Sequence, residues 1–203
     1  MNSCPIKAGA AKALGSFLSR LPALTEIDFH KVKYGLFTAE GLANLIQGLN
    51  GATLAVRDIS LLYCDIPEDA GRSLGELLRL MPNLQKLNFG KHDKLFTANG
   101  FHGIVEGLGD LKELPTQDLE MATASISPEA GLPLGQILGR MTNLRVLSMV
   151  STSALDLDMT SPDSTFFFSK QGCRKVKCSR GNSIVCSGPK KFLSMLAIRN
   201  FML

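Results

Sequence analysis

A short alternating pattern of apolar residues recurs five times along this chain. In each copy two apolar positions lie three residues apart and a third follows two residues later, as at Leu84, Leu87 and Phe89. The five copies begin at Leu24, Val56, Leu84, Thr116 and Leu144, so they are separated by 32, 28, 32 and 28 residues. Alternate side chains of a strand point to opposite faces, so the pattern predicts five short strands, each with one apolar face. The copy that begins with Thr116 is the weakest, because a hydroxyl group replaces its first apolar side chain.

Each strand pattern is preceded by a segment with the apolar spacing of a helix. Residues 37–49 return in closely related form at 96–108, with apolar side chains every three or four residues. Thr38 and Thr97 are predicted to cap these two helices, and the Ser-Pro-Glu sequence of residues 127–129 to begin another. Alternating strands and helices predict a parallel sheet covered by helices on one side. Because helices are wider than strands, the stack should curve, with strands on the concave face and helices on the convex face.

A glycine recurs inside every predicted helix, where it costs about 1 kcal/mol relative to alanine. We expect close packing of these helices on the strand layer to compensate, while the alternative is that the glycines end or break the helices. The positions are Gly9, Gly41, Gly71, Gly100 and Gly131.

The repeats resemble a known class of protein. Residues 56–66 fit the leucine-rich repeat template L-x-x-L-x-L-x-x-N/C-x-L, with Val and Ile in place of Leu. Units of 28 and 32 residues that alternate and carry full helices resemble the ribonuclease-inhibitor class of these repeats, over about residues 5–155. Residues 70–87 are similar to the C-terminal repeats of NOD-like innate immune receptors. The resemblance implies an α/β leucine-rich repeat solenoid of about five units, which offers a partner-binding or autoinhibitory surface without catalysis.

The chain departs from the family at the residue after each strand, where Asn or Cys would hydrogen-bond the loop backbone. Only one of the five positions matches, so we expect looser loops in units one, three and four, with a partial substitute in the last hydroxyl. The positions are Val32, Cys64, His92, Ala124 and Thr152. No polar cap is evident near Met1, which favours a fragment of a larger multidomain protein and leaves open whether Met1 is the true start.

The basic charge is confined to the end of the chain. Residues 150–203 hold eight Lys or Arg against three Asp, whereas residues 1–149 carry a net charge of −1. We therefore predict a repeat array over 1–155 and a non-repeat basic tail over 156–203. The tail is expected to be poorly ordered, or alternatively to cover the last unit with its phenylalanines. The overall positive charge does not indicate nucleic-acid binding.

The residues between the apolar positions should face outward from the concave side of the sheet. The candidates for contact with a partner are Glu26, Asp28, His30, Asp58, Ser60, Lys86, Asn88, Asp118, Glu120 and Ser148. Five acids against one lysine predict a protein partner with a basic patch, since like charges in a concave surface reinforce one another. An ordinary solvated strand face is the alternative.

Other chemistry finds little support in the sequence. His30, His92 and His102 show no metal-ligand spacing, and Cys173, Cys178 and Cys186 lack a fourth ligand for a closed zinc site. No catalytic or phosphate-binding motif, membrane-length apolar stretch, secretory signal or glycosylation sequon is found. We therefore expect a cytoplasmic protein that is not an enzyme, has no cofactor or metal, and binds neither nucleic acid nor membrane.

The sequence thus favours a protein-protein interaction module, for ligand sensing or autoinhibition, in an innate immune receptor-like protein. Two alternatives stay open. One is a stand-alone cytosolic enzyme inhibitor of the ribonuclease-inhibitor type, and the other is an adaptor repeat of a GTPase regulator or ubiquitin ligase.

Overall fold

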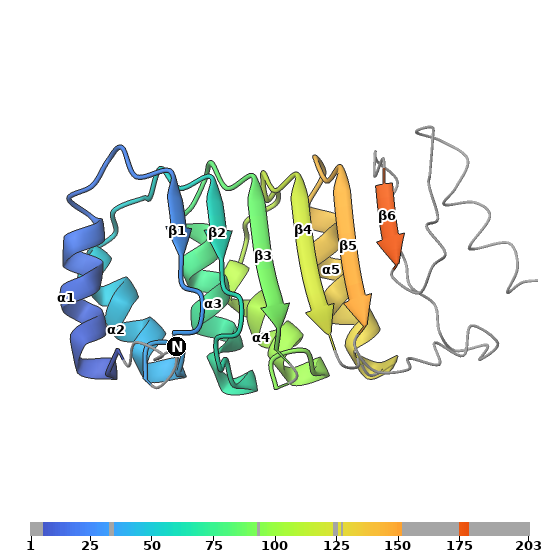
Figure 1. The fold of residues 1–203 in the computed structure, drawn as a ribbon, viewed down its shortest axis with the longest axis horizontal. Helices are drawn as coiled ribbons and strands as arrows, with labels where there is room; N and C mark the ends of the chain where they lie inside the picture. Colours follow the sequence, from blue (N-terminus) through green and yellow to red (C-terminus); the bar gives the residue numbers. More distant parts are fainter. Residues whose placement is uncertain are drawn as a thin grey trace, which may run out of the picture.

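A parallel sheet and a layer of helices, each built from consecutive units, make up the array (Figure 1). The computed structural model describes residues 6–32, 35–92, 94–123, 126, 128–151 and 175–178. Within these residues the strands are β1 (Glu26–Asp28), β2 (Asp58–Ser60), β3 (Lys86–Lys91), β4 (Asp118–Thr123), β5 (Val146–Ser151) and β6 (Lys175–Cys178). The helices are α1 (Ala8–Leu18), α2 (Ala39–Leu49), α3 (Gly71–Arg79), α4 (Ala98–Leu108) and α5 (Gly131–Arg140), with 3-10 turns η1 (Glu68–Ala70) and η2 (Pro128–Ala130).

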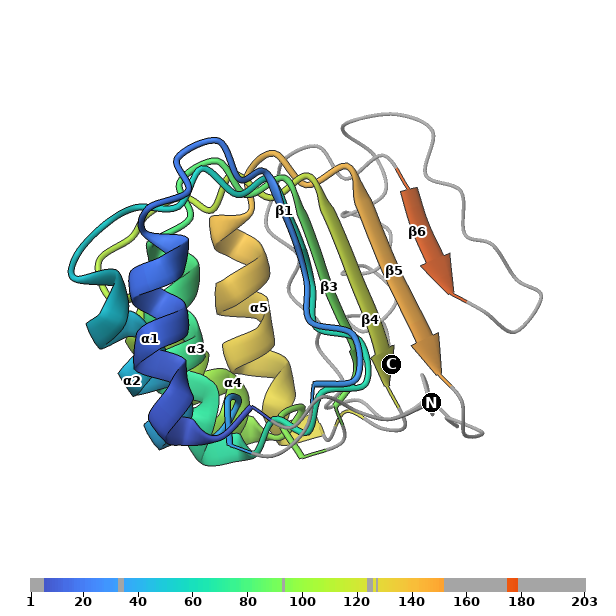
Figure 2. The same ribbon diagram turned by 60° about the vertical axis from the view of Figure 1, so that its left-hand side comes forward.

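The strands pair in chain order, and their register reproduces the sequence pattern. The central apolar residues are aligned from strand to strand in the series Ile27, Ile59, Leu87, Leu119 and Leu147. The offsets between these partners are the 32, 28, 32 and 28 residues of the sequence pattern. The helices all cover one side of the sheet and leave the other side open (Figure 2). The fold is therefore a leucine-rich repeat solenoid, with the sheet on its concave face and the helices on its convex face.

The core lies between the two layers and consists of the apolar residues of both patterns. Aromatic rings continue it into the loops beyond the strands, where Phe89 meets Phe96 edge-on and Phe96 stacks on Phe101. Burial of each large side chain stabilises the fold by roughly 1.5–3 kcal/mol. Thr116 is the exception: it is fully buried, and its hydroxyl has no hydrogen-bond partner among the described residues. The weakness expected of that copy therefore has a physical cause, an unpaired polar group in the core.

Two kinds of helix start alternate along the array. Thr38 and Thr97 cap α2 and α4 as predicted, since their hydroxyl oxygens accept hydrogen bonds from the backbone N–H of Gly41 and Gly100 at 3.1 and 3.0 Å. The helices α3 and α5 instead follow the 3-10 turns η1 and η2. Ser127, the third predicted cap, lies outside the described residues. The two sequence types of unit are thus two structural types.

The five recurrent glycines do not pack on the strand layer, so that expectation is wrong. All five lie within helices, often at the first residue, and do not end them. A Cβ added at Gly41 or Gly100 would meet the carbonyl oxygen of Gly35 or Leu95 in the preceding loop, and one at Gly71 would meet that of Gly100 in α4. Gly9 and Gly131 have open space at the Cβ position.

Other glycines bring neighbouring helices together in pairs. A Cβ on Gly15 of α1 would lie 2.9 Å from the backbone nitrogen of Leu49 in α2. One on Gly75 of α3 would lie 2.9 Å from the backbone nitrogen of Leu108 in α4. Real Cβ atoms do not approach so closely, so these helix pairs require glycine. The 60-residue double unit seen in the sequence therefore corresponds to a closely packed helix pair.

The last strand adds a sixth position to the sheet. β6 pairs parallel with β5, and Val176 is the register partner of Leu147. The sequence Cys173-x-x-Val176-x-Cys178 has the spacing of the strand pattern, 29 residues after Leu144. The expectation that the pattern stops after residue 151 is therefore wrong for this strand. The rest of the predicted tail, including Cys173 and Cys186, lies outside the described residues.

None of the described helices has the length and apolar character that a membrane crossing requires.

Two glycines of α1 provide a test of the helix pairing. Gly15→Ala should lower the free energy of unfolding by about 1–3 kcal/mol, because the methyl group has to displace the backbone of α2. Gly9→Ala in the same helix is the matched control and should raise it by up to about 1 kcal/mol, because the site is open and alanine favours helix. Urea denaturation of both variants measures the difference. Equal effects of the two substitutions would show that α1 and α2 are not held at this distance.

Candidate functional site

The strand register arranges the candidate residues in two rows across the open face of the sheet. The first row is Glu26, Asp58, Lys86, Asp118 and Val146, and the second is Asp28, Ser60, Asn88, Glu120 and Ser148. Every one of these side chains is exposed or half-buried, while the apolar residues between them are buried. Neighbouring strands lie about 4.8 Å apart, so the members of a row are close neighbours. The structure thus gathers nine of the ten candidates, and His30 follows β1 in the adjoining loop.

Two of the acids have partners on the same face. Lys86 Nζ lies 3.7 Å from Asp58 Oδ2, and Asn88 Nδ2 donates a hydrogen bond to Glu120 Oε2 at 3.0 Å. An exposed ion pair contributes at most about 1 kcal/mol, so the lysine offsets one negative charge without fixing the pair rigidly. The Asn88 contact orients the Glu120 carboxylate without neutralising it.

The remaining acids keep their charge open to solvent. Asp28 Oδ1 accepts a hydrogen bond from the backbone N–H of His30 at 2.9 Å. Glu26 and Asp118 make no side-chain hydrogen bond or ion pair with any residue that the structure describes. Five carboxylates therefore face one ammonium group across β1–β4, and the face can attract a cationic ligand.

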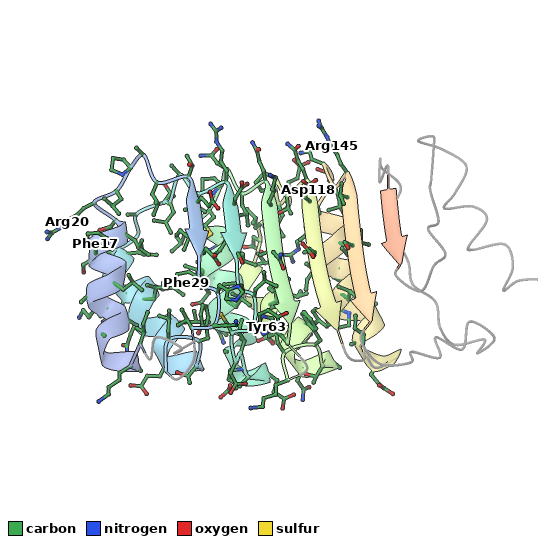
Figure 3. All side chains as sticks on the ribbon, viewed as in Figure 1. Phe17, Arg20, Phe29, Tyr63, Asp118 and Arg145 are labelled. Atoms are coloured by element: carbon green, nitrogen blue, oxygen red, sulfur yellow. The ribbon has the colours of Figure 1, made fainter. Side chains whose placement is uncertain are left out.

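Arginines border these rows at one edge, a feature that the sequence reasoning missed. Arg57 and Arg145 directly precede β2 and β5, and both side chains are exposed. Figure 3 shows Arg145 at the N-terminal end of its strand, on the level where Asp118 begins β4. The position before each outward-facing residue of the pattern would have revealed them. The negative charge is therefore bounded on the N-terminal side of the strands.

An exposed aromatic cluster lies at the opposite edge, beyond the C-terminal ends of β1 and β2 (Figure 3). The Tyr63 ring meets the His30 ring edge-on, with centroids 5.4 Å apart, and Lys31 Nζ lies 5.8 Å from the Tyr63 ring centroid. Tyr63 is 53% exposed, unlike almost every other large aromatic side chain among the described residues. The sequence signal was its place in an outward-facing position of the repeat template, directly before Cys64.

The loops after the strands are held by a series of side chains that includes an unexpected member. The Cys64 thiol donates to the carbonyl oxygen of Phe29 at 3.0 Å, as the template implies. His92 Nε2 lies 2.9 Å from the carbonyl oxygen of Leu61. Because that carbonyl only accepts, His92 must donate through Nε2–H. His92 thus does for its unit what Cys64 does for the preceding one, and the expected looseness of unit three is wrong.

Burial sets the protonation of these two side chains. It raises the pKa of the Cys64 thiol to about 12, so the group stays a neutral donor. It lowers the pKa of His92, which is 3% exposed and whose Nδ1 has no hydrogen-bond partner within the described ranges. In unit one, Val32 offers only its backbone N–H, which donates to Phe29 O at 3.0 Å. Ala124 and Thr152 lie outside the described residues.

The three histidines serve different parts of the fold. His92 supports a loop, His30 contacts Tyr63, and His102 on α4 lies 3.4 Å from Glu106 on the helical side. Among the described residues no group of three or more His, Cys, Asp or Glu side chains is placed to hold a metal ion.

Fold and site together define a leucine-rich repeat protein whose charged sheet face is open. The chain is similar to ribonuclease inhibitor from pig (Sus scrofa), with 27% identity over 136 residues. The match covers 65% of this chain and 29% of that protein, so the chain spans less than a third of this relative's length. No protein-family model matches the chain.

His92 should make stability depend on pH. Because the folded chain holds the pKa of His92 below its ordinary value of about 6.5, the unfolded chain binds the proton more readily. The free energy of unfolding should therefore be greatest above about pH 6.5 and fall below it, by at most about 1.4 kcal/mol per pH unit. His92→Asn keeps a donor at this position without a titrating group. Urea denaturation between about pH 8 and 5 should show the stability of the natural chain falling relative to the variant, and a constant difference would contradict this account.

Proposed function

We propose that the chain is a protein-protein interaction module and that the open face of β1–β4 is its binding surface. The observation that carries the proposal is the alignment of five carboxylates in two rows, on a face that no described helix covers. A flat, polar array of short strands, held by a core behind it, presents these side chains without loop rearrangement. Binding would then cost little conformational entropy.

The charge of this face favours a partner with a basic patch. Glu26 and Asp118 carry no counter-charge among the described residues, and only Asp58 has a lysine beside it. Opposite charges across an interface speed association and fix its register more than they add affinity. Binding should accordingly weaken as salt increases.

We further propose that the module serves ligand sensing or autoinhibition in a cytoplasmic innate immune receptor-like protein. The support is the similarity of residues 70–87 to NOD-like receptor repeats. Sequencing the full transcript tests this step, because an upstream nucleotide-binding or death-fold domain is required by it and a transcript without one would refute it.

A second candidate function is inhibition of an enzyme. The observation that favours it is the similarity to ribonuclease inhibitor. Titration of a ribonuclease with the purified chain tests it directly: stoichiometric loss of ribonuclease activity supports inhibition, and unchanged activity at a large excess of the chain argues against inhibition of that enzyme.

Charge reversal on the sheet tests the main proposal. A variant carrying Asp28→Lys, Asp58→Lys and Glu120→Lys should lose at least about tenfold in affinity for a partner captured by the natural chain, because attraction becomes repulsion. Surface plasmon resonance at two salt concentrations measures the loss and its salt dependence.

The matched control changes net charge equally on the helical side, with Glu40→Lys, Asp69→Lys and Glu106→Lys, all at exposed positions. It should bind like the natural chain. If the two triple variants lose affinity equally, or neither does, the sheet face is not the binding surface.

A further inference from the structure

Tyr63 occupies a backbone conformation that its side chain disfavours. Its φ angle is 58°, in the left-handed region that suits glycine or asparagine and costs a bulky residue roughly 1 kcal/mol or more. More than half of the side chain is exposed, so burial contributes little in compensation. A strained and exposed aromatic residue is a reason to look for a ligand contact, provided the surrounding geometry supports one.

The surrounding side chains hold the ring in place before any partner arrives. His30 meets its edge and Lys31 lies over it, with Nζ 5.8 Å from the ring centroid. The ring of Tyr63 thus already attracts a cation, and the remaining exposed ring surface is open to a second one. Because the ring is ordered in the free protein, little rotamer freedom is lost when a ligand stacks on it.

A carboxylate stands beside this cluster. Asp28 Oδ1 accepts from the backbone N–H of His30, whose ring touches Tyr63, so acid and aromatic ring are joined through a single residue. A guanidinium group is planar, stacks on aromatic faces and donates several hydrogen bonds to carboxylates at once. An ammonium group is a compact charge that is strongly hydrated and cannot stack. The combination of ring and carboxylate therefore suits arginine better than lysine.

We propose that the partner of this face presents arginine rather than lysine, and that Tyr63 selects it by stacking on a guanidinium group while Asp28 accepts its hydrogen bonds. This inference rests on the proposed function, because it names the chemistry of the partner at the same face. It assigns specificity to the loop edge at β1 and β2, and general cation attraction to the rows of acids.

Two short peptides serve as probes, nona-arginine and nona-lysine. The chain contains two tyrosines and no tryptophan, so in a Tyr34→Phe background Tyr63 is the only strong intrinsic fluorophore. Nona-arginine should change the Tyr63 emission and bind more tightly than nona-lysine. Calorimetry should then show that Tyr63→Leu weakens nona-arginine by about two- to fivefold and leaves nona-lysine unchanged. Tyr63→Phe keeps the ring and should restore the preference.

The outcomes separate this inference from the proposed function. If Tyr63→Leu weakens both peptides equally, or neither, selection by Tyr63 is refuted. If the triple reversal at Asp28, Asp58 and Glu120 leaves both peptides unaffected, the acidic binding face itself is refuted. Tyr63→Gly also removes the ring and suits the positive φ angle, so it should reproduce the leucine result with an unreduced melting temperature; failure of the two variants to agree would overturn the assignment.

Discussion

In-register pairing of successive parallel strands is the interaction on which the rest of this structure depends. β1 and β2 have only three residues each, and neither could persist without the neighbour that supplies its hydrogen bonds. The same register stacks the apolar residues into one continuous core behind the sheet. It also places outward-facing side chains from distant parts of the sequence in common rows. Core and candidate site are therefore two faces of a single constraint, and a shift of one residue would exchange them.

Two further devices hold the units at their distances. On the helical side, Gly15 and Gly75 let helix backbones approach in pairs, which gives the array its two-unit rhythm. At the loop edge, Cys64 and His92 each donate to a carbonyl group of the preceding unit. Both devices act only between neighbours, as expected for a solenoid whose stability is a sum over adjacent units. A local change should therefore loosen one junction before it affects the whole array.

Much of this arrangement could be predicted from the sequence, because the strand pattern and the Thr38 and Thr97 caps depend on local spacing. The role of His92 could not, since a template names Asn or Cys whereas the loop requires only a donor that reaches a carbonyl oxygen. Nor could the Tyr63 cluster, which depends on a left-handed backbone angle. The glycines were correctly found but wrongly placed, because their neighbours lie in other units. The strand at Lys175–Cys178 was missed because cysteines stand at two of its three pattern positions.

The central claim is that the open sheet face, and not the helical face, receives a cationic partner. Chemical-shift mapping of the isotope-labelled chain with nona-arginine tests it most directly. The account predicts that the largest amide shifts fall on β1–β4 and on the loops that contain His30 and Tyr63, with helices α1–α5 nearly unaffected. Shifts concentrated on the helices would contradict it.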